Sequence, residues 1–311
     1  MKSTDQPERE AARLVHLYED GAFSRRELMD RLARRLGSGA AAVAALEALG
    51  LAHLTAETGA AQTAAGCPAD VKVPENAPDV DARMIEFQGK AGTIFGHLAR
   101  PKAQADAPRP AVLVLHENRG LTEHIRDVTR RVARAGYVGL GIDLVSRAGG
   151  SYKFTDPEEG AAAYRKTERG AMLEDMLSGL EYLKAQKFVR GDRLGAVGFC
   201  AGGGNCFNLA ANSKDLTAAV VFYGAPPSPL SALDGMTAAL LGIFAEEDAR
   251  INAQVPALIA ALLEKEKRFG IHIYPGTNHA FHNDTGPRYN RAAACDAWAN
   301  TLEFFNAFLR G

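Results

Sequence analysis

The sequence has 311 residues and a mass of 33.2 kDa, which is long enough for one large α/β domain with a small appendage. Hydrophobic residues make up 47% and charged residues 23% of the chain, the balance of an ordinary globular protein. The formal net charge of −1 excludes a strong overall attraction to nucleic acid or acidic lipid. No apolar run predicts a membrane span, so we expect neither a nucleic-acid nor a membrane partner.

The first 65 residues are rich in alanine and arginine and contain no strand pattern. We predict three short helices there, and a capping box of Ser24 and Glu27 opens the second of them. The predicted helices cover residues 6–20, 24–36 and 39–50. Three prolines then indicate an extended linker over residues 66–82. The predicted organisation is therefore a helical extension (1–65), a linker (66–82) and a catalytic domain (83–311).

The N-terminal segment also has features of an export signal. Arg25 and Arg26 resemble a degraded twin-arginine motif, and Cys67 follows a stretch of small residues. Glu47 and His53 interrupt the apolar run that such a signal needs. A retained helical extension and a cytoplasmic protein are therefore favoured, and periplasmic export is the alternative.

Strand-like and helix-like segments alternate from residue 83 onward, and several strands are continuous apolar runs. Such runs are typical of strands that are covered on both faces. The alternation predicts a mostly parallel central sheet flanked by helices. The predicted strands cover 83–87, 93–98, 111–116, 137–142, 193–199, 218–223, 239–244 and 271–274, and the predicted helices cover 123–135, 158–184, 202–212, 254–266 and 288–309.

The sharpest chemical signal is Gly198-Phe199-Cys200-Ala201-Gly202, which follows an apolar strand and opens a helix. This is the nucleophile-elbow pattern of α/β-hydrolases, with cysteine where serine usually stands. The glycines permit a tight strand-to-helix turn, and the helix N-terminus favours a thiolate and an oxyanion. The competing interpretation is a buried structural cysteine beside a glycine-rich turn.

A cysteine nucleophile needs a base and an acid that orients the base. In this fold the chain order is nucleophile, acid, histidine, and Asp248 and His279 follow Cys200 in that order at the ends of predicted strands. His282 is an alternative base, and His279, His282 and Asp284 are a weak candidate for a metal site. We expect no metal and no organic cofactor.

The loop after the third apolar strand, Leu115-His116-Glu117-Asn118-Arg119-Gly120, occupies the place of an oxyanion loop. We assign the oxyanion hole to the backbone N–H groups of Asn118 and Ala201. The charge of Glu117 is a candidate for tuning the thiol or its proton, and a plain surface turn is the alternative. Further candidates for substrate binding are His116, Arg119, Arg147, Tyr223 and Arg288, although a solvated surface position is favoured for Arg147 and Arg288.

From about Arg83 to its end, the sequence resembles the dienelactone hydrolase (carboxymethylenebutenolidase-like) family. The resemblance rests on HENRG, GFCAGG, the Asp248 loop and NHAF followed by a helix with Trp298. It implies an α/β-hydrolase fold and hydrolysis of a lactone or related ester, with attack by Cys200, His279 as base and then acid, and Asp248 as its orienting group. It also implies that Glu117 contacts the resting thiol and helps deprotonate it when substrate arrives.

The family binds a substrate carboxylate with arginines, and the segment between Asp143 and Glu174 differs from the family's archetype, which leaves the substrate open. The alternatives are a thioesterase or peptidase on the same site, or a binding module that has lost the chemistry. We expect a small-molecule lactone or ester as partner, and a homodimer is compatible with the sequence.

Overall fold

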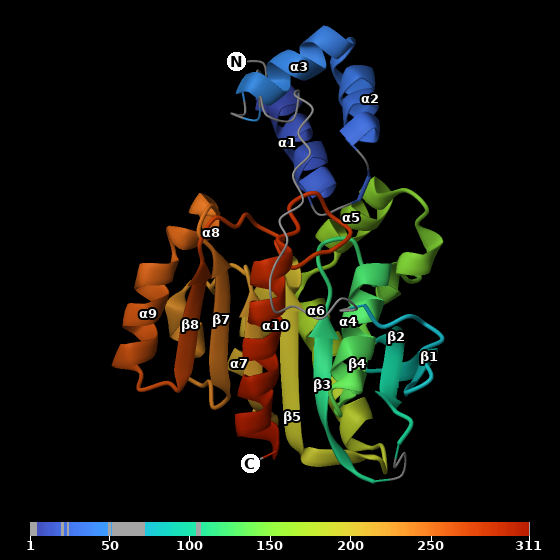
Figure 1. The fold of residues 1–311 in the computed structure, drawn as a ribbon, viewed down its shortest axis with the longest axis vertical. Coiled ribbons are helices and arrows are strands. Elements are labelled where there is room, and N and C mark those ends of the chain that lie inside the picture. Colours follow the sequence, from blue (N-terminus) through green and yellow to red (C-terminus); the bar gives the residue numbers. More distant parts are fainter. Residues whose placement is uncertain are drawn as a thin grey trace.

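The computed structural model describes residues 5–19, 22–23, 25–48, 51, 72–103 and 107–310. These residues form an eight-stranded sheet in the order β1-β2-β4-β3-β5-β6-β7-β8, flanked by helices on both faces (Figure 1). The strands are β1 (Val80–Gly89), β2 (Gly92–Pro101), β3 (Arg109–Leu115), β4 (Val138–Ile142), β5 (Val189–Phe199), β6 (Leu216–Phe222), β7 (Ala239–Ala245) and β8 (Phe269–Tyr274). Only the pairings β1–β2 and β2–β4 are antiparallel.

Two apolar cores cover the two faces of this sheet. Helices α6, α7 and α9 pack on one face, while α4 and α10 pack on the other. The α-helices of this domain are α4 (Glu123–Arg134), α5 (Pro157–Lys166), α6 (Arg169–Lys184), α7 (Ala201–Asn212), α8 (Ala249–Asn252), α9 (Val255–Glu264) and α10 (Arg291–Phe305). Short 3-10 helices cover Ser146–Ala148, Ser151–Lys153 and Leu230–Leu233, and a π-helical turn, Asn306–Arg310, extends α10. The predicted α/β-hydrolase fold is confirmed.

The structure differs from the sequence prediction over residues 158–184, where one helix was expected and two are found. Helix α5 ends before Thr167, whose backbone is extended (ψ 125°), and α6 begins at Arg169. The β-branched Thr167 has a weak helical preference, and its hydroxyl donates to the carbonyl of Ala163 (3.1 Å). The break places the end of α5 and the start of α6 on one side of the pocket described below.

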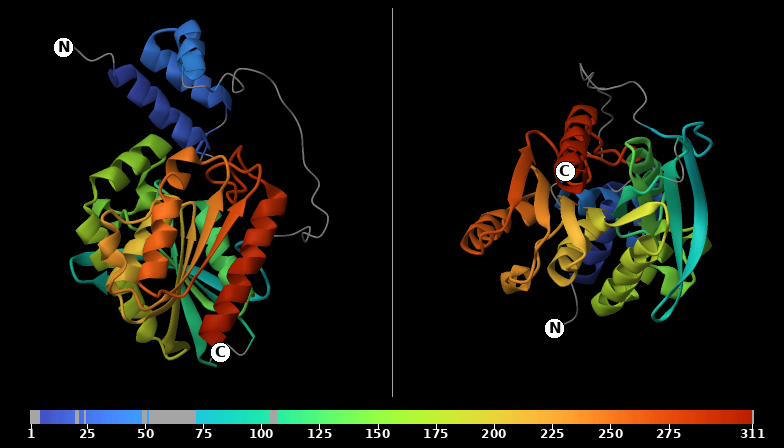
Figure 2. Two further views of the ribbon diagram at one scale, coloured as in Figure 1. Left: turned by 90° about the vertical axis from the view of Figure 1, so that its left-hand side faces the viewer. Right: turned by 90° about the horizontal axis from the view of Figure 1, so that it is seen from below.

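The N-terminal helical unit, which we define as α1 (Asp5–Glu19), α2 (Arg25–Leu36) and α3 (Gly39–Ala48), lies over the edge of the sheet where the parallel strands end (Figures 1 and 2). Its helices share a core of their own. Ser24 of the predicted capping box and Cys67 of the export-signal alternative lie outside the described residues. No helix in the described ranges has the length and hydropathy needed to cross a membrane.

The described end of the predicted linker is packed against the domain. Val73 and Ala77 are buried with Val80 of β1 and residues of β2 and α4, and the N–H of Val73 donates to the Asp127 carboxylate (2.7 Å). Strand β1 begins at Val80, within the predicted linker range. Apolar side chains at residues 73 and 77 therefore fix this segment, although its prolines suggested a free connection.

A buried charge cluster joins the loop after β8 to α4. Asp284 accepts from Arg131 (2.7 Å) and pairs with His124 (3.0 Å) and Lys72 (3.6 Å). Burial opposes ionisation of Asp284, but His124, Arg131 and Lys72 outweigh it and hold the pKa of the carboxyl well below its ordinary value. Asp284 is therefore ionised in the folded protein at neutral pH.

Asp284→Asn is expected to lower the free energy of unfolding by about 2–3 kcal/mol at pH 7, because it leaves buried Arg131 and His124 without their shared acceptor. The depressed pKa stabilises the fold fully above about pH 4, the unfolded value, and this stabilisation is lost as the pH falls further. Urea unfolding is measured from pH 7 to 3. The free energies of unfolding of the wild type and Asp284→Asn should approach each other as the pH falls. Asp192→Asn, at a carboxylate that is 67% exposed, serves as the control and should change stability by less than about 0.5 kcal/mol. An equal loss in both variants would contradict the role of the cluster.

Candidate active site

Cys200 lies on a sharp turn between β5 and α7. Its backbone has φ 55° and ψ −115°, a conformation that non-glycine residues rarely adopt. The turn depends on its glycines, because a Cβ on Gly198 would collide with the carbonyl of Gly202, and a Cβ on Gly202 with that of Leu115. The N–H of Cys200 donates to Phe222 (3.0 Å), and its carbonyl accepts from Gly203 (3.0 Å). These contacts hold the thiol at the first turn of α7.

His279 and Asp248 come together at the same sheet edge. His279 Nδ1 lies 2.5 Å from Asp248 Oδ2, and Asp248 caps α8 by accepting from the N–H of Ile251 (3.3 Å). Burial raises the pKa of Asp248, but the hydrogen bond and charge of His279 outweigh it and hold the pKa below its ordinary value. An ionised Asp248 keeps the proton on Nδ1, which leaves Nε2 as the basic nitrogen. Within the described part of the chain, Nε2 has no hydrogen-bond partner.

His282 is in the wrong environment for the alternative base. Its ring is buried, stacks on Phe199 (5.1 Å between centroids) and has no hydrogen bond to any described residue. Burial lowers its pKa well below the ordinary value. The alternative metal site fails too, because Asp248 holds His279 and Asp284 is held by His124 and Arg131. No group of three or more His, Cys, Asp or Glu side chains suited to a metal occurs among the described residues.

His116 has a structural position rather than the predicted substrate-binding one. Its ring is fully buried, with Nδ1 2.5 Å from the carbonyl of Glu117 and Nε2 accepting from the N–H of Leu144 (2.9 Å). Burial lowers its pKa, so the imidazole is neutral and both nitrogens bond to backbone. His116 therefore ties the oxyanion loop to the end of β4.

Glu117 and Arg119 form a buried pair behind this loop. The Nδ2 group of Asn283 donates to Glu117 Oε2 (2.8 Å), and Arg119 Nη2 lies 3.6 Å from the same oxygen. Asn283 belongs to the loop that carries His279. Glu117 thus links the loop after β3 to the loop after β8, while the predicted substrate contact by Arg119 is replaced by this internal pairing.

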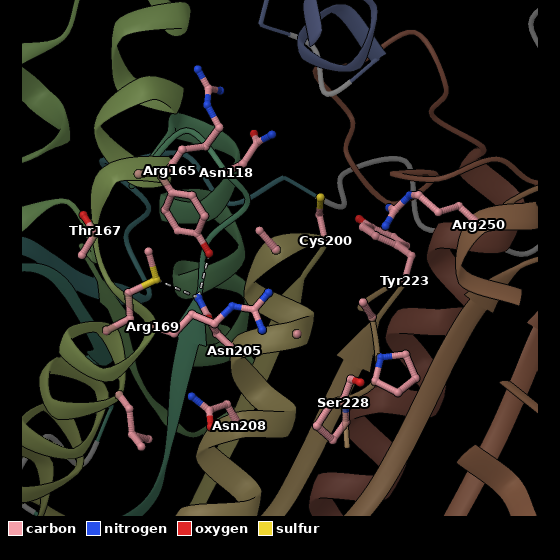
Figure 3. A pocket seen from close by; sticks show the side chains of 18 of the residues that line it. Asn118, Arg165, Thr167, Arg169, Cys200, Asn205, Asn208, Tyr223, Ser228 and Arg250 are labelled. Carbon is pink, nitrogen blue, oxygen red and sulfur yellow. Dashed lines mark hydrogen bonds between the residues drawn. The ribbon is translucent and has the colours of Figure 1, made fainter. Parts of the chain in front are cut away.

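Cys200 opens into a cavity of about 960 Å³ at the carboxyl edge of the sheet. Figure 3 shows Cys200 at the start of α7, with Asn118 on one side and Tyr223 on the other. Tyr223 has a positive φ of 40°, and its ring lies 5.0 Å from that of His279. The cavity therefore brings together the thiol, the predicted oxyanion residues Asn118 and Ala201, and a tyrosine that contacts the histidine.

None of the three arginines predicted to bind substrate, Arg119, Arg147 and Arg288, lines this cavity. Arg147 is held by Asp175 (2.9 Å) and Glu174 (3.0 Å) of α6. Arg288 donates to the carbonyl of His279 (3.2 Å) and forms an ion pair with Glu19 of α1. The long side chain of arginine reaches carboxylates that are remote in sequence, which the sequence pattern could not reveal.

The sequence analysis missed several residues of the cavity. Arg165, Arg169 and Arg250 line it, and none has a carboxylate partner among the described residues. In Figure 3, Arg169 and Arg250 extend into the cavity from opposite sides. The OH of Tyr164 accepts from Asn205 (2.9 Å), and burial raises the pKa of this tyrosine to about 12. Of these missed residues, only Arg250 could have been predicted from the sequence, because it follows Asp248 by two residues at the end of a predicted strand.

Comparison with known proteins places the chain in a family. The model of the dienelactone hydrolase family matches residues 94–309. A Saccharolobus solfataricus protein named "Putative carboxymethylenebutenolidase" is 34% identical over 258 residues, covering 71% of this chain and 97% of its own. A Bradyrhizobium protein named "Probable 2-oxo-3-(5-oxofuran-2-ylidene)propanoate lactonase" is 32% identical, covering 70% of this chain and 90% of its own.

Among solved structures, a Klebsiella pneumoniae protein described as a "Putative Dienelactone Hydrolase" matches with a TM-score of 0.68 and 29% identity. The match covers 74% of this chain and 99% of that protein. Together with the family match, it identifies the chain as an enzyme of carboxylic ester hydrolysis. The chain belongs to the dienelactone hydrolase family and has the α/β-hydrolase fold.

Proposed function

We propose that this enzyme hydrolyses a lactone or related ester with Cys200 as nucleophile, His279 as base and acid, and Asp248 as the residue that orients His279. The observation that carries the proposal is the pairing of Asp248 with Nδ1 of a histidine whose Nε2 has no partner among the described residues. The thiol stands on the strained turn after β5, at the same edge of the sheet, and lines the cavity.

The chemistry follows from these positions. The sulfur of Cys200 attacks the carbonyl carbon while His279 Nε2 takes the thiol proton, and the N–H groups of Asn118 and Ala201 receive the oxyanion. The ester C–O bond breaks, and His279 returns its proton to the leaving oxygen. Water, deprotonated by His279, then attacks the thioester, which releases the acid and regenerates the thiol. We propose that buried Glu117 assists the first proton transfer; Asn283 and Arg119 hold its carboxylate on the loop that carries Asn118.

The charge of the cavity supports an anionic substrate. Among the described residues, three guanidinium groups and one carboxylate line it, and that carboxylate, Glu19, forms an ion pair with Arg288. Unpaired guanidinium groups at a pocket favour a substrate carboxylate, which arginine binds through two hydrogen bonds. The name of the Bradyrhizobium relative describes a lactone that carries a propanoate group, the same combination of lactone and carboxylate.

The proposal is tested with a matched panel of a lactone that bears a carboxylate, the same lactone without it, a p-nitrophenyl ester and a thioester. The carboxylate-bearing lactone is expected to have the highest kcat/KM. Arg250→Ala should lower that value about tenfold and the value for the neutral lactone much less, because a charge-assisted hydrogen bond contributes about 1.5–3 kcal/mol. Arg190→Ala, at the start of β5, is the control and should change neither. Equal losses on both lactones, or a preference for the thioester, would contradict the assignment.

A further inference from the structure

Helix α1 contributes a wall to the cavity that contains Cys200. Ala12, His16 and Glu19 line the cavity, and their spacing of four and three residues places them on one face of the helix. The ring of His16 lies 5.8 Å from that of His279. The N-terminal helical unit thus reaches the histidine of the proposed triad, although it lies outside residues 94–309 that match the family.

Ion pairs fasten the N-terminal helical unit on two sides of the cavity. On one side, Glu19 pairs with Arg288, which donates to the His279 carbonyl. Burial lowers the pKa of Arg288 to about 10, as expected of a guanidinium largely removed from water. Glu19 is itself only 8% exposed. This side of the unit is therefore tied to the loop that positions the base.

On the other side, α2 is fastened to α5. Arg31 donates to Asp156 (3.1 Å) and Glu158 (2.7 Å), and Arg35 donates to Glu158 (2.8 Å). Ala161 of α5 is part of the apolar core of the N-terminal helical unit. Because α5 also carries Tyr164 and Arg165 of the cavity, the unit spans the cavity between two of its walls.

We propose that α1 is a specificity wall of this enzyme and that His16 contacts the substrate, while Ala12 keeps space beside it for the acyl group. The inference rests on the proposed function. Helix α1 lies outside residues 94–309 that match the family model, so this wall is additional to the matched part of the chain. The wall limits the length of the acyl group that the cavity accepts. The thiol chemistry is carried out by residues within the range 94–309 that matches the family.

The test is the acyl-length profile of the full-length protein on p-nitrophenyl acetate, butyrate and octanoate. His16→Ala should widen the cavity and raise the octanoate-to-acetate ratio of kcat/KM by about tenfold, as expected for a few methylene groups in a pocket. Ala12→Phe should lower the same ratio by about tenfold. Ala12 is exposed, so the added ring disturbs little packing within the helical unit. Arg34→Ala, at an exposed position of α2 outside the cavity lining, should leave the ratio unchanged.

The octanoate-to-acetate ratio distinguishes a substrate contact from a purely structural role of α1. A purely structural role would change kcat/KM for all three esters by the same factor. Such a uniform change, or ratios within twofold of wild type in both variants, would overturn the inference. Cys200→Ala is measured on the same panel. Hydrolysis that depends on Cys200 with an unaltered profile would reject only the wall, whereas hydrolysis that Cys200→Ala retains in full would reject the proposed function.

Discussion

Cys200→Ala is expected to lower kcat/KM for the preferred ester or lactone by about 10⁴-fold or more, because no acyl-enzyme can form without the sulfur. The fold should remain, since the change removes one atom from a side chain that faces a cavity. Rates are measured by steady-state hydrolysis, and the acyl-enzyme by mass spectrometry after rapid acid quenching. A mass increase on the Cys200 peptide in the wild type identifies the nucleophile directly.

Cys206→Ala provides the matched control on the same helix. The Cys206 thiol is fully buried, and burial raises its pKa to about 12, so it is an inert thiol. The variant should keep kcat/KM within about twofold and lose roughly 1 kcal/mol of stability from the vacated volume. If Cys200→Ala kept an activity close to that of Cys206→Ala, the assignment of Cys200 as the nucleophile would be wrong.

Asp248→Asn is expected to reduce kcat about 10³-fold or more while leaving the fold intact. An amide cannot stabilise the imidazolium, and its NH₂ group can donate to Nδ1 and thereby select the wrong tautomer. Because the pKa of Asp248 lies below its ordinary value, this carboxylate stays ionised above about pH 4. Its titration should therefore produce no limb in the pH–rate profile between about pH 5 and 9.

Glu247→Gln separates this effect from a general loss of loop charge. Glu247 precedes Asp248, is exposed, and accepts from Asn278 Nδ2 (2.6 Å). Removing its charge should change kcat less than about threefold, because an exposed carboxylate is screened by water. Similar losses in the two variants would mean that charge in the loop, and not a hydrogen bond to His279, supports catalysis.

Local sequence was sufficient for much of the fold. Each of the eight predicted strands overlaps an observed one, although several boundaries differ by two to four residues. Apolar runs between turn signals leave few alternatives to a buried strand. The elbow was also readable, since the glycines at 198 and 202 are required by contacts within the turn itself and with the neighbouring strand. The order of Cys200, Asp248 and His279 at strand ends predicted the sheet edge at which Asp248 and His279 meet.

The sequence by itself determined the order of the candidate catalytic residues along the chain: a thiol on a tight turn, then an acid, then a histidine, each at the end of a predicted strand. Only the tertiary structure shows that Asp248 pairs with His279, while His282 stacks on Phe199, because this difference depends on buried neighbours and not on local sequence. It also showed that Arg147 and Arg288 form ion pairs away from the cavity lining, and that α1 lines the cavity that contains Cys200. These outcomes depend on contacts between residues far apart in the chain, which hydrophobic periodicity and turn signals do not encode.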